Sequence, residues 1–314
     1  MSIEPKLTFK LKKKMNETNN ETPMEIPKEK PVKKEKPVKK SSVRRLLFID
    51  ASFYIFYRYS ATKVWYSKHQ KREGECNVEN AEFLASYSKH FNDWIVKIQK
   101  KMKADQVYWF KDEPLETLWR TPHFEGYKKS REDKCPEAIG PIFRHTYENL
   151  IPKERVISVK KAEADDCVAI AVRYENRTNA ETKIVVITGD TDYIQLINEN
   201  TRVVKMPLLD DMPIEIKMGK KERVVTTPEI YIKTKIIMGD SCDEIPKVYS
   251  SCNPKTALEI AQNDEIFKKL IEDHPERLEK YNKNRMLMHF DEIPDEIRQN
   301  GEEIYQKVVS INEK

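Results

Sequence analysis

Residues 183–196 read KIVVITGDTDYIQL. The part from Lys183 to Thr188 is an almost uninterrupted apolar run, which is typical of a strand buried on both faces of a parallel sheet. Gly189 ends this run, and two carboxylates, Asp190 and Asp192, follow at once. The stretch therefore predicts a central strand that carries acidic side chains to its carboxyl end.

Three other apolar runs end in the same way, with acidic residues just beyond them. They cover residues 46–49, 107–110 and 156–159. Between the runs, residues 78–103 place apolar side chains at helical spacing, and helical runs are predicted near 163–174 and 191–198. Strands that alternate with helices indicate an α/β fold with a mainly parallel central sheet flanked by helices.

The carboxyl ends of parallel strands share one edge of a sheet, where such folds bind ligands. The acidic residues predicted at this edge are Asp50, Asp112, Glu163, Asp165, Asp166, Asp190 and Asp192, and Asp240 and Asp243 follow a later helical run. So many like charges repel one another unless cations neutralise them. The set contains no His or Cys, so we expect Mg²⁺ or Mn²⁺ rather than Zn²⁺. A metal-dependent reaction on a phosphate substrate is the expected chemistry.

The N-terminal segment 1–42 differs in composition from the rest of the chain. It contains 12 Lys and 6 Glu, whereas the remainder holds 45 basic and 46 acidic residues. We expect this Lys- and Pro-rich tail to be disordered. It could be a nuclear-import signal, a nucleic-acid-binding arm or a solvated tail. Because the rest of the chain is nearly neutral, the overall positive charge does not by itself indicate nucleic-acid binding.

The five cysteines are scattered through the chain and form no CxxC pair, which argues against a zinc knuckle or a disulfide framework. An intracellular, reducing compartment is expected, with the nucleus or a viral replication site as alternatives. No apolar run approaches the ~18 residues of a membrane span. We therefore expect no membrane association.

The second half of the chain changes character after residue 200. Short strands with a hairpin at Gly219 are expected within 201–225, and helices at 227–238 and from Pro254 suggest a helix–hairpin–helix near 227–262. The expected domains are the tail 1–42, a sheet domain 43–225 with an irregular basic segment near 113–150, and a helical subdomain 226–314.

Several blocks resemble motifs of one family, the 5′-nuclease superfamily, which includes flap endonucleases, phage 5′–3′ exonucleases and the 5′-nuclease domain of bacterial DNA polymerase I. The block GDTDYIQL at 189–196 is similar to its Gly-Asp-x-Asp-x-x-Gln-Leu signature. The blocks EADD at 163–166, GDSCDEIP at 239–246, and WR at 119–120 followed by YKKSR at 127–131 resemble further motifs. They occur in the family order, over about residues 45–260.

The resemblance implies a PIN-like fold with a helical arch near 113–150 and a C-terminal helix–hairpin–helix subdomain. It implies metal-dependent 5′–3′ exonuclease and structure-specific 5′ flap endonuclease activity on DNA, with two Mg²⁺ ions that Mn²⁺ can replace. One ion is then expected among Asp50, Asp112, Glu163 and Asp165, and the other among Asp190, Asp192 and Asp243. Asp166 and Asp240 are expected to act through water or to be shared.

The resemblance also assigns basic and aromatic residues. Lys128 and Arg131 are expected to steer and polarise the scissile phosphate. Arg120 is expected to hold the arch or contact phosphate, and Tyr127 to stack on a base or to pack. Lys255 and Thr256 are expected to bind duplex phosphates. The family's Gly-Ile-Gly, whose glycines allow close backbone approach and a monovalent-cation site, is replaced across 250–253.

The sequence is also compatible with other interpretations. Each acidic group alone could cap or begin a helix. A PIN-like ribonuclease, or a 5′-nuclease acting on RNA–DNA hybrids, is a related enzyme class, and a non-catalytic protein that binds DNA structures is a further alternative. We expect a monomer, and no motif at the C-terminus supports a sliding clamp as a partner.

Overall fold

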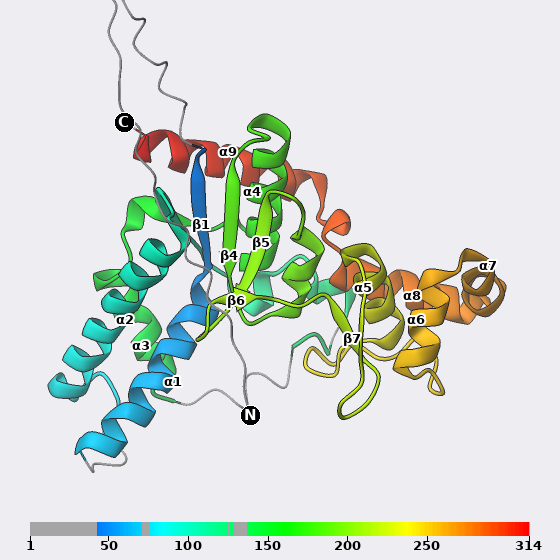
Figure 1. The fold of residues 1–314 in the computed structure, drawn as a ribbon, viewed down its shortest axis with the longest axis horizontal. Helices are drawn as coiled ribbons and strands as arrows, with labels where there is room; N and C mark the ends of the chain where they lie inside the picture. The colour runs from blue at the N-terminus through cyan, green and yellow to red at the C-terminus, as the bar shows by residue number, and fades with distance from the viewer. Residues whose placement is uncertain (1–42, 71–75, 125, 129–136, 314) are drawn as a thin grey trace, which may run out of the picture. The chain divides into compact units, whose positions relative to one another are not determined.

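The computed structural model describes residues 43–70, 76–124, 126–128 and 137–313. A six-stranded sheet lies at its centre, in the order β3-β2-β1-β4-β5-β6 (Figure 1). The strands are β1 (Arg45–Asp50), β2 (Gln106–Phe110), β3 (Val156–Ile157), β4 (Lys183–Ile187), β5 (Thr201–Lys205) and β6 (Asp210–Asp211). All neighbouring strands are parallel except β5 and β6. The predicted mainly parallel sheet is confirmed.

Helices cover both faces of this sheet. Leu47 and Ile49 of β1 face α1 (Ala51–Gln70), α2 (Ala81–Met102) and α3 (Ile139–Asn149). Leu46 and Phe48 face the other way, toward α4 (Ala164–Thr178) and α9 (Asp295–Asn312). These four β1 side chains are fully buried. Burial on both faces explains why the strand sequences are continuous apolar runs rather than alternating patterns.

One long helix has no counterpart in the sequence predictions. The helix α1 begins directly after β1, and residues 53–57, FYIFY, form a continuous apolar and aromatic run within it. Such a run has no helical period and is rich in residues that favour strands, so it does not indicate a helix. By contrast, α2 carries an apolar stripe at helical spacing, and Asn80 caps its first turn through Glu82 and Phe83 amides.

Three strand and helix predictions need correction in detail. The third strand is limited to Val156–Ile157, and the Ser158 hydroxyl just beyond it donates to Glu113 at 2.8 Å. The expected helix at 191–198 is a 3₁₀ helix, η5 (Thr191–Leu196). The region 201–225 holds more strands than expected, since β5 extends the main sheet and a separate hairpin is formed by β7 (Glu215–Lys217) and β8 (Arg223–Val225).

The C-terminal part is helical, as expected. It contains α5 (Pro228–Met238), α6 (Pro254–Gln262), α7 (Asp264–Phe267), a π-helical turn (Lys268–Glu272), α8 (Pro275–Met288), a 3₁₀ turn (Phe290–Glu292) and α9. Helices α5 and α6 pack on each other, whereas α9 returns to α4 and the edge strand β3. Residues 42–314 thus form one compact unit, in which the two ends of segment 226–314 pack on different neighbours.

Parts of the predictions lie outside the described residues. These are the tail 1–42 and, within the expected arch, residue 125 and residues 129–136, which include Arg131. The described flanks of the arch are the 3₁₀ turns η1 (Leu115–Thr117) and η2 (Thr121–His123) and the helix α3. None of the helices in the described part of the chain is long and apolar enough to cross a membrane.

Candidate active site

A cavity of about 500 Å³ opens where β1, β2 and β4 end. Its lining includes the carboxylates of Asp50, Asp112, Glu163, Asp165 and Asp190, and the ammonium group of Lys128. Apolar side chains complete the lining, among them Phe53, Phe56 and Phe143. The strand ends therefore bring together acidic residues that are up to 140 positions apart in the sequence.

Four of these carboxylates form what we call the open acidic cluster: Asp50, Asp112, Asp165 and Asp190. Among the described residues, no Lys, Arg or His lies within ion-pair distance of any of the four. Carboxylates that lie close together without a cation repel one another, and this repulsion disfavours the ionised form of each. The cluster is therefore an arrangement that a cation from outside the chain would stabilise.

Asp50 is the last residue of β1 and is fixed by three donors. Its Oδ1 accepts from the Phe53 amide at 3.0 Å, which caps α1, and its Oδ2 accepts from the hydroxyls of Thr188 and Tyr193, both at 3.2 Å. Burial raises the pKa of Asp50 to about 7, and the carboxylate of Asp112 adds to the increase. The side chain is thus held in place while its negative charge remains uncompensated.

Asp112 and Asp165 come from the second strand end and the first turn of α4. Asp112 accepts hydrogen bonds from the Ser52 hydroxyl and, at 2.8 Å, from the Ala164 amide, so it ties α1 and α4 together. Burial raises the pKa of Asp165 well above its usual range, and Glu163 and Asp166 raise it further. Glu163 is itself the N-cap residue of α4. The capping explanation and the metal-binding hypothesis are therefore compatible at this helix start.

Asp166 and Arg120 form a buried anchor beside the cavity. The Arg120 guanidinium donates to both Asp166 oxygens at 2.7 and 2.8 Å and to Glu163 at 2.9 Å. Trp119 Nε1 donates to Asp166 at 2.9 Å, and the Glu163 amide donates to it at 3.2 Å. Both Asp166 oxygens accept hydrogen bonds that fix Trp119 and Arg120 to α4, and an Asp166 oxygen also lies within 4.8 Å of carboxylate oxygens of Glu163 and Asp165.

This anchor corrects the phosphate contact expected for Arg120. The side chain is only 1% exposed and its guanidinium lies 4.4 Å from the centre of the Trp119 ring, so DNA cannot reach it in this structure. Its contacts with Glu163 and Asp166 are instead consistent with the other expected role, which is to hold the arch segment. Tyr127 is also buried, and its hydroxyl donates to Glu163 at 2.8 Å, which is the packing role rather than an exposed stacking surface.

Lys128 lies between the acidic groups. Its ammonium donates to Glu163 and lies 3.9 Å from Asp243. Burial raises the pKa of Glu163, but Lys128 and Arg120 outweigh burial and lower it to about 2. Lys128 has a positive φ of 55°, a conformation that costs energy for a residue with a side chain. The structure thus places this predicted catalytic cation at the edge of the acidic cavity.

A second group, which we call the lysine-paired cluster, consists of Asp192, Asp240 and Asp243, whose oxygens lie within 4.8 Å of one another. Lys235 of α5 donates to Asp192 and lies 2.8 Å from Asp240. Burial raises the pKa of Asp192 to about 6 although Lys235 lowers it, whereas for Asp240 the effect of Lys235 outweighs burial and lowers the pKa.

Lys235 was not predicted from the sequence. It stands in the apolar segment IKTKIIM, where a lysine is most simply explained as an exposed position of a helix. The sequence hint of its role is that it lies five residues before Asp240. That spacing does not predict a contact unless the chain turns back at Gly239. Gly239 has φ 66°, and a Cβ there would lie 2.4 Å from the Ile245 carbonyl oxygen. Only glycine fits this turn, which returns Asp240 to Lys235.

Lys255 and Thr256 lie apart from the acidic cavity, in the first turn of α6. Lys255 is exposed, and the Thr256 amide is capped by the Asn253 side chain at 3.0 Å. In the preceding loop, which replaces the family's glycines, Cys252 is buried and its carbonyl accepts from Lys247 at 2.7 Å. The duplex contact expected at Lys255 and Thr256 stays a prediction.

The donor set suits hard divalent cations. Carboxylates from β1, from the residues after β2 and β4, and from α4 meet at one edge of the sheet, with no His or Cys lining the cavity among the described residues. Oxygen ligands of this kind are typical of Mg²⁺ and Mn²⁺. Thr188, Tyr193, Ser52 and the Ala164 amide orient these carboxylates, as outer partners do in metal sites.

Comparison with known proteins identifies the class. The sequence profile described as "5'-3' exonuclease, N-terminal resolvase-like domain" matches residues 45–231, which is more than half of the chain. The chain therefore belongs to this family, and the resemblance to the 5′-nuclease superfamily is confirmed.

Individual relatives carry related names. A 5'-3' exonuclease of Buchnera aphidicola subsp. Acyrthosiphon pisum (strain APS) is 27% identical over 223 residues, which are 68% of each chain. A 5'-3' exonuclease of Bacillus subtilis (strain 168) is 31% identical over 159 residues, 49% of this chain and 51% of that protein. DNA polymerase I of Lactococcus lactis subsp. lactis (strain IL1403) is 29% identical over 161 residues, half of this chain but only 18% of the polymerase.

Solved structures share the fold. The flap endonuclease of bacteriophage T5, in a pseudo-enzyme-product complex with DNA and metal ions, covers 86% of this chain and all of its own, with a TM-score of 0.61 and 16% identity. The T5 5'-exonuclease with bound zinc covers 85% of this chain and 99% of its own, with a TM-score of 0.60 and 16% identity. This likeness supports the PIN-like α/β fold expected from the sequence.

Proposed function

We propose that the chain hydrolyses phosphodiester bonds of DNA as a 5′–3′ exonuclease and structure-specific 5′ flap endonuclease. The observation that carries this proposal is the open acidic cluster, four carboxylates in one cavity without a cationic partner among the described residues. Family membership and the names of the relatives support the reaction class.

We propose Mg²⁺ as the cofactor, bound as two ions, with Mn²⁺ as a substitute. When bound, the ions supply a nucleophilic water at neutral pH and neutralise the charge of the phosphate. Asp50, Asp112, Asp165 and Asp190 would hold ions in the cavity, and Asp192, Asp240 and Asp243 offer a second set of oxygens.

The fixed residues of the chain then have separate tasks. Lys128, oriented by Glu163, places a positive charge at the rim of the cavity, where it can attract and position a scissile phosphate. The ion pair between Arg120 and Asp166 fixes Arg120 to α4, eight residues before Lys128 in the chain. The apolar side of the cavity, with Phe53, Phe56 and Phe143, limits the access of water.

The T5 relative in complex with DNA supports DNA as the substrate class. The test is cleavage of a 5′-labelled flapped DNA duplex by the purified protein with Mg²⁺, Mn²⁺ or EDTA. A matching single strand and an RNA–DNA hybrid of the same sequence serve as competing substrates. Cleavage of the flapped DNA at its junction, with Mg²⁺ and not with EDTA, is the expected result. Preference for the hybrid would redirect the proposal to an RNA–DNA nuclease, and absence of cleavage with either metal would overturn it.

A further inference from the structure

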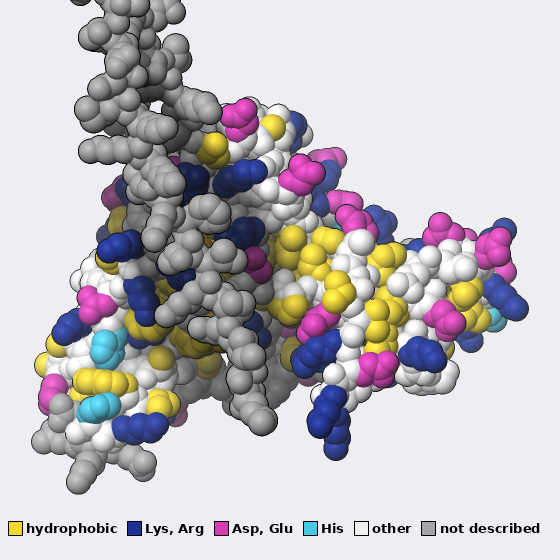
Figure 2. All heavy atoms as spheres, viewed as in Figure 1, with side chains coloured by type: hydrophobic (Ala, Val, Ile, Leu, Met, Phe, Trp, Pro, Cys, Tyr) yellow, Lys and Arg dark blue, Asp and Glu magenta, His cyan; other side chains and the backbone are white. Residues whose placement is uncertain are grey.

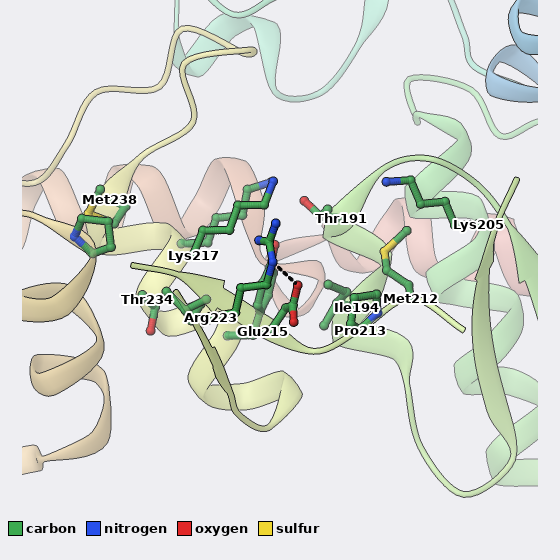
Figure 3. A pocket seen from close by; sticks show the side chains of 14 residues that line it. Thr191, Ile194, Lys205, Met212, Pro213, Glu215, Lys217, Arg223, Thr234 and Met238 are labelled. Atoms are coloured by element: carbon green, nitrogen blue, oxygen red, sulfur yellow. Dashed lines mark ion pairs between the residues drawn. The ribbon is translucent and has the colours of Figure 1, made fainter. Parts of the chain in front are cut away.

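A second cavity lies beside the acidic one. It measures about 450 Å³ and is formed by β5, the hairpin β7–β8, α5 and η5 (Figure 3). Apolar side chains make up much of its lining, among them Ile194, Met212, Pro213, Ile216 and Met238. The space is within the range of small-molecule sites in proteins and is large enough for one nucleotide.

The polar lining of this cavity is strongly basic. It contains Lys205, Lys217, Arg223 and Lys235, with Glu215 as the acidic residue of the lining. Two of the cations are already paired: Arg223 lies 3.2 Å from Glu215, and Lys235 contacts Asp192 and Asp240. Lys205 and Lys217 form no ion pair with any described residue. The cavity therefore holds an excess of positive charge that the chain does not neutralise.

The two unpaired lysines come from different elements and line the same cavity. Lys205 extends from β5 and Lys217 from β7, and both line the cavity together with Thr191 of η5 (Figure 3). On the surface, Lys and Arg side chains gather over the β7–β8 hairpin next to an apolar area (Figure 2). Ammonium and hydroxyl donors that line one cavity together with apolar side chains suit a phosphate that is attached to a flat organic group.

The position of the cavity suggests which phosphate it receives. Thr191 lies in the chain between Asp190 of the open acidic cluster and Asp192 of the lysine-paired cluster, and it lines the second cavity. Lys235 forms part of the same lining and contacts Asp192. Adjacent residues of the chain, Asp190 and Thr191, therefore line the two cavities, and Lys235 links the second cavity to Asp192.

We propose that the second cavity binds one nucleotide of the DNA substrate, with its phosphate against Lys205 and Lys217 and its sugar and base on the floor formed by Met212, Pro213 and Ile216. This inference rests on the proposed function, because it takes DNA as the substrate. It differs from general electrostatic attraction in one respect: the binding depends on a base as well as on a phosphate.

The test compares two variants with the same change in charge. Lys205→Ala/Lys217→Ala removes the two unpaired cations of the cavity, and Lys220→Ala/Lys221→Ala removes two exposed cations at the turn of the same hairpin, outside the cavity lining. The affinity of each full-length protein for a fluorescent flapped DNA is measured in EDTA over a range of salt concentrations. Circular dichroism checks that both variants are folded.

We expect the cavity variant to bind the flapped DNA roughly tenfold more weakly than the turn variant. Its salt slope should be shallower by about 0.9, the value for one lost phosphate contact. Equal losses in the two variants would overturn the cavity site while leaving the proposed nuclease intact. If the wild-type protein binds no DNA and cleaves none, the proposed function fails and the nucleotide site fails with it.

A second arm tests the base. A single abasic nucleotide is moved along the flapped DNA, and we expect one position at which it weakens binding of the wild-type protein but not of Lys205→Ala/Lys217→Ala. A flat profile in the wild-type protein would show contacts to the backbone alone and would overturn the proposal. Binding of deoxyadenosine monophosphate that depends on Lys205 and Lys217, without any such effect on DNA, would identify a site for free nucleotide and would equally overturn it.

Discussion

The open acidic cluster and the lysine-paired cluster have similar composition but opposite electrostatic surroundings. Asp50, Asp112, Asp165 and Asp190 line one cavity without a cation from the described chain. In the neighbouring cluster, Lys235 already contacts Asp192 and Asp240. The consequence is visible at the carboxylates: burial and acidic neighbours raise the pKa of Asp50 to about 7, whereas at Asp240 Lys235 outweighs burial and lowers the pKa.

The difference indicates that the two clusters bind divalent ions under different conditions. An ion in the open acidic cluster relieves repulsion and displaces no charged group of the described chain. An ion in the lysine-paired cluster has to compete with the ammonium of Lys235, because both interact with the same oxygens. We therefore expect the open acidic cluster to bind first, and the order can be tested by substitutions that remove one charge at a time.

The largest effect is expected from Asp165→Ala. It removes a carboxylate of the open acidic cluster that has no cationic partner, so the ion loses a ligand while the protein loses no ion pair. Because metal ions supply several kcal/mol of transition-state stabilisation, we expect cleavage of flapped DNA to fall by at least about a thousandfold. Rates under single-turnover conditions with Mg²⁺ measure this. Turnover near the wild-type rate would remove Asp165 from the metal site.

The adjacent residue should behave in the opposite way. Asp166→Ala leaves the Arg120 guanidinium buried without its bidentate partner, and breaking a buried ion pair of this kind costs about 3–5 kcal/mol. We expect the free energy of unfolding by urea, in EDTA, to fall by about that amount. Asp165→Ala is the matched control, and its unfolding free energy should remain close to that of the wild-type protein. Equal losses in both variants would contradict the division between anchor and metal ligand.

The sequence predicts much of this site because of a geometric rule. Asp50, Asp112 and Asp190 follow apolar strands, and the carboxyl ends of parallel strands have to meet at one edge whatever the order of the strands. The fold class follows from the same alternation of strands and helices. These predictions need only the spacing of apolar residues and the order of strands and helices along the chain. They need no distance between side chains.

The sequence does not predict the parts that depend on tertiary contacts. Arg120 is a basic residue in a basic segment, and only the packing of that segment on α4 shows that it pairs with Asp166. Lys235 reaches the acidic site because Gly239 turns the chain back, which no periodic pattern encodes. The helix α1 was missed because its run at 53–57 is apolar or aromatic at every position. Tyr54 and Ile55 are buried, but the exposed Phe56 is apolar too, so no polar position reveals a helical period.

The smallest effect sharpens the comparison between the two clusters. Lys235→Met removes the competing ammonium, so Mn²⁺ or Mg²⁺ should bind the lysine-paired cluster more tightly. At a saturating ion concentration, a tenfold gain in affinity adds about 1.4 kcal/mol to the free energy by which the ion stabilises the folded protein. Urea unfolding with and without the ion measures that difference. Lys233→Met is the control, because Lys233 lies on the same helix but pairs with the exposed Asp264. If the ion stabilises Lys235→Met no more than Lys233→Met, Lys235 does not compete with metal, and the lysine-paired cluster is then held together by its lysine alone.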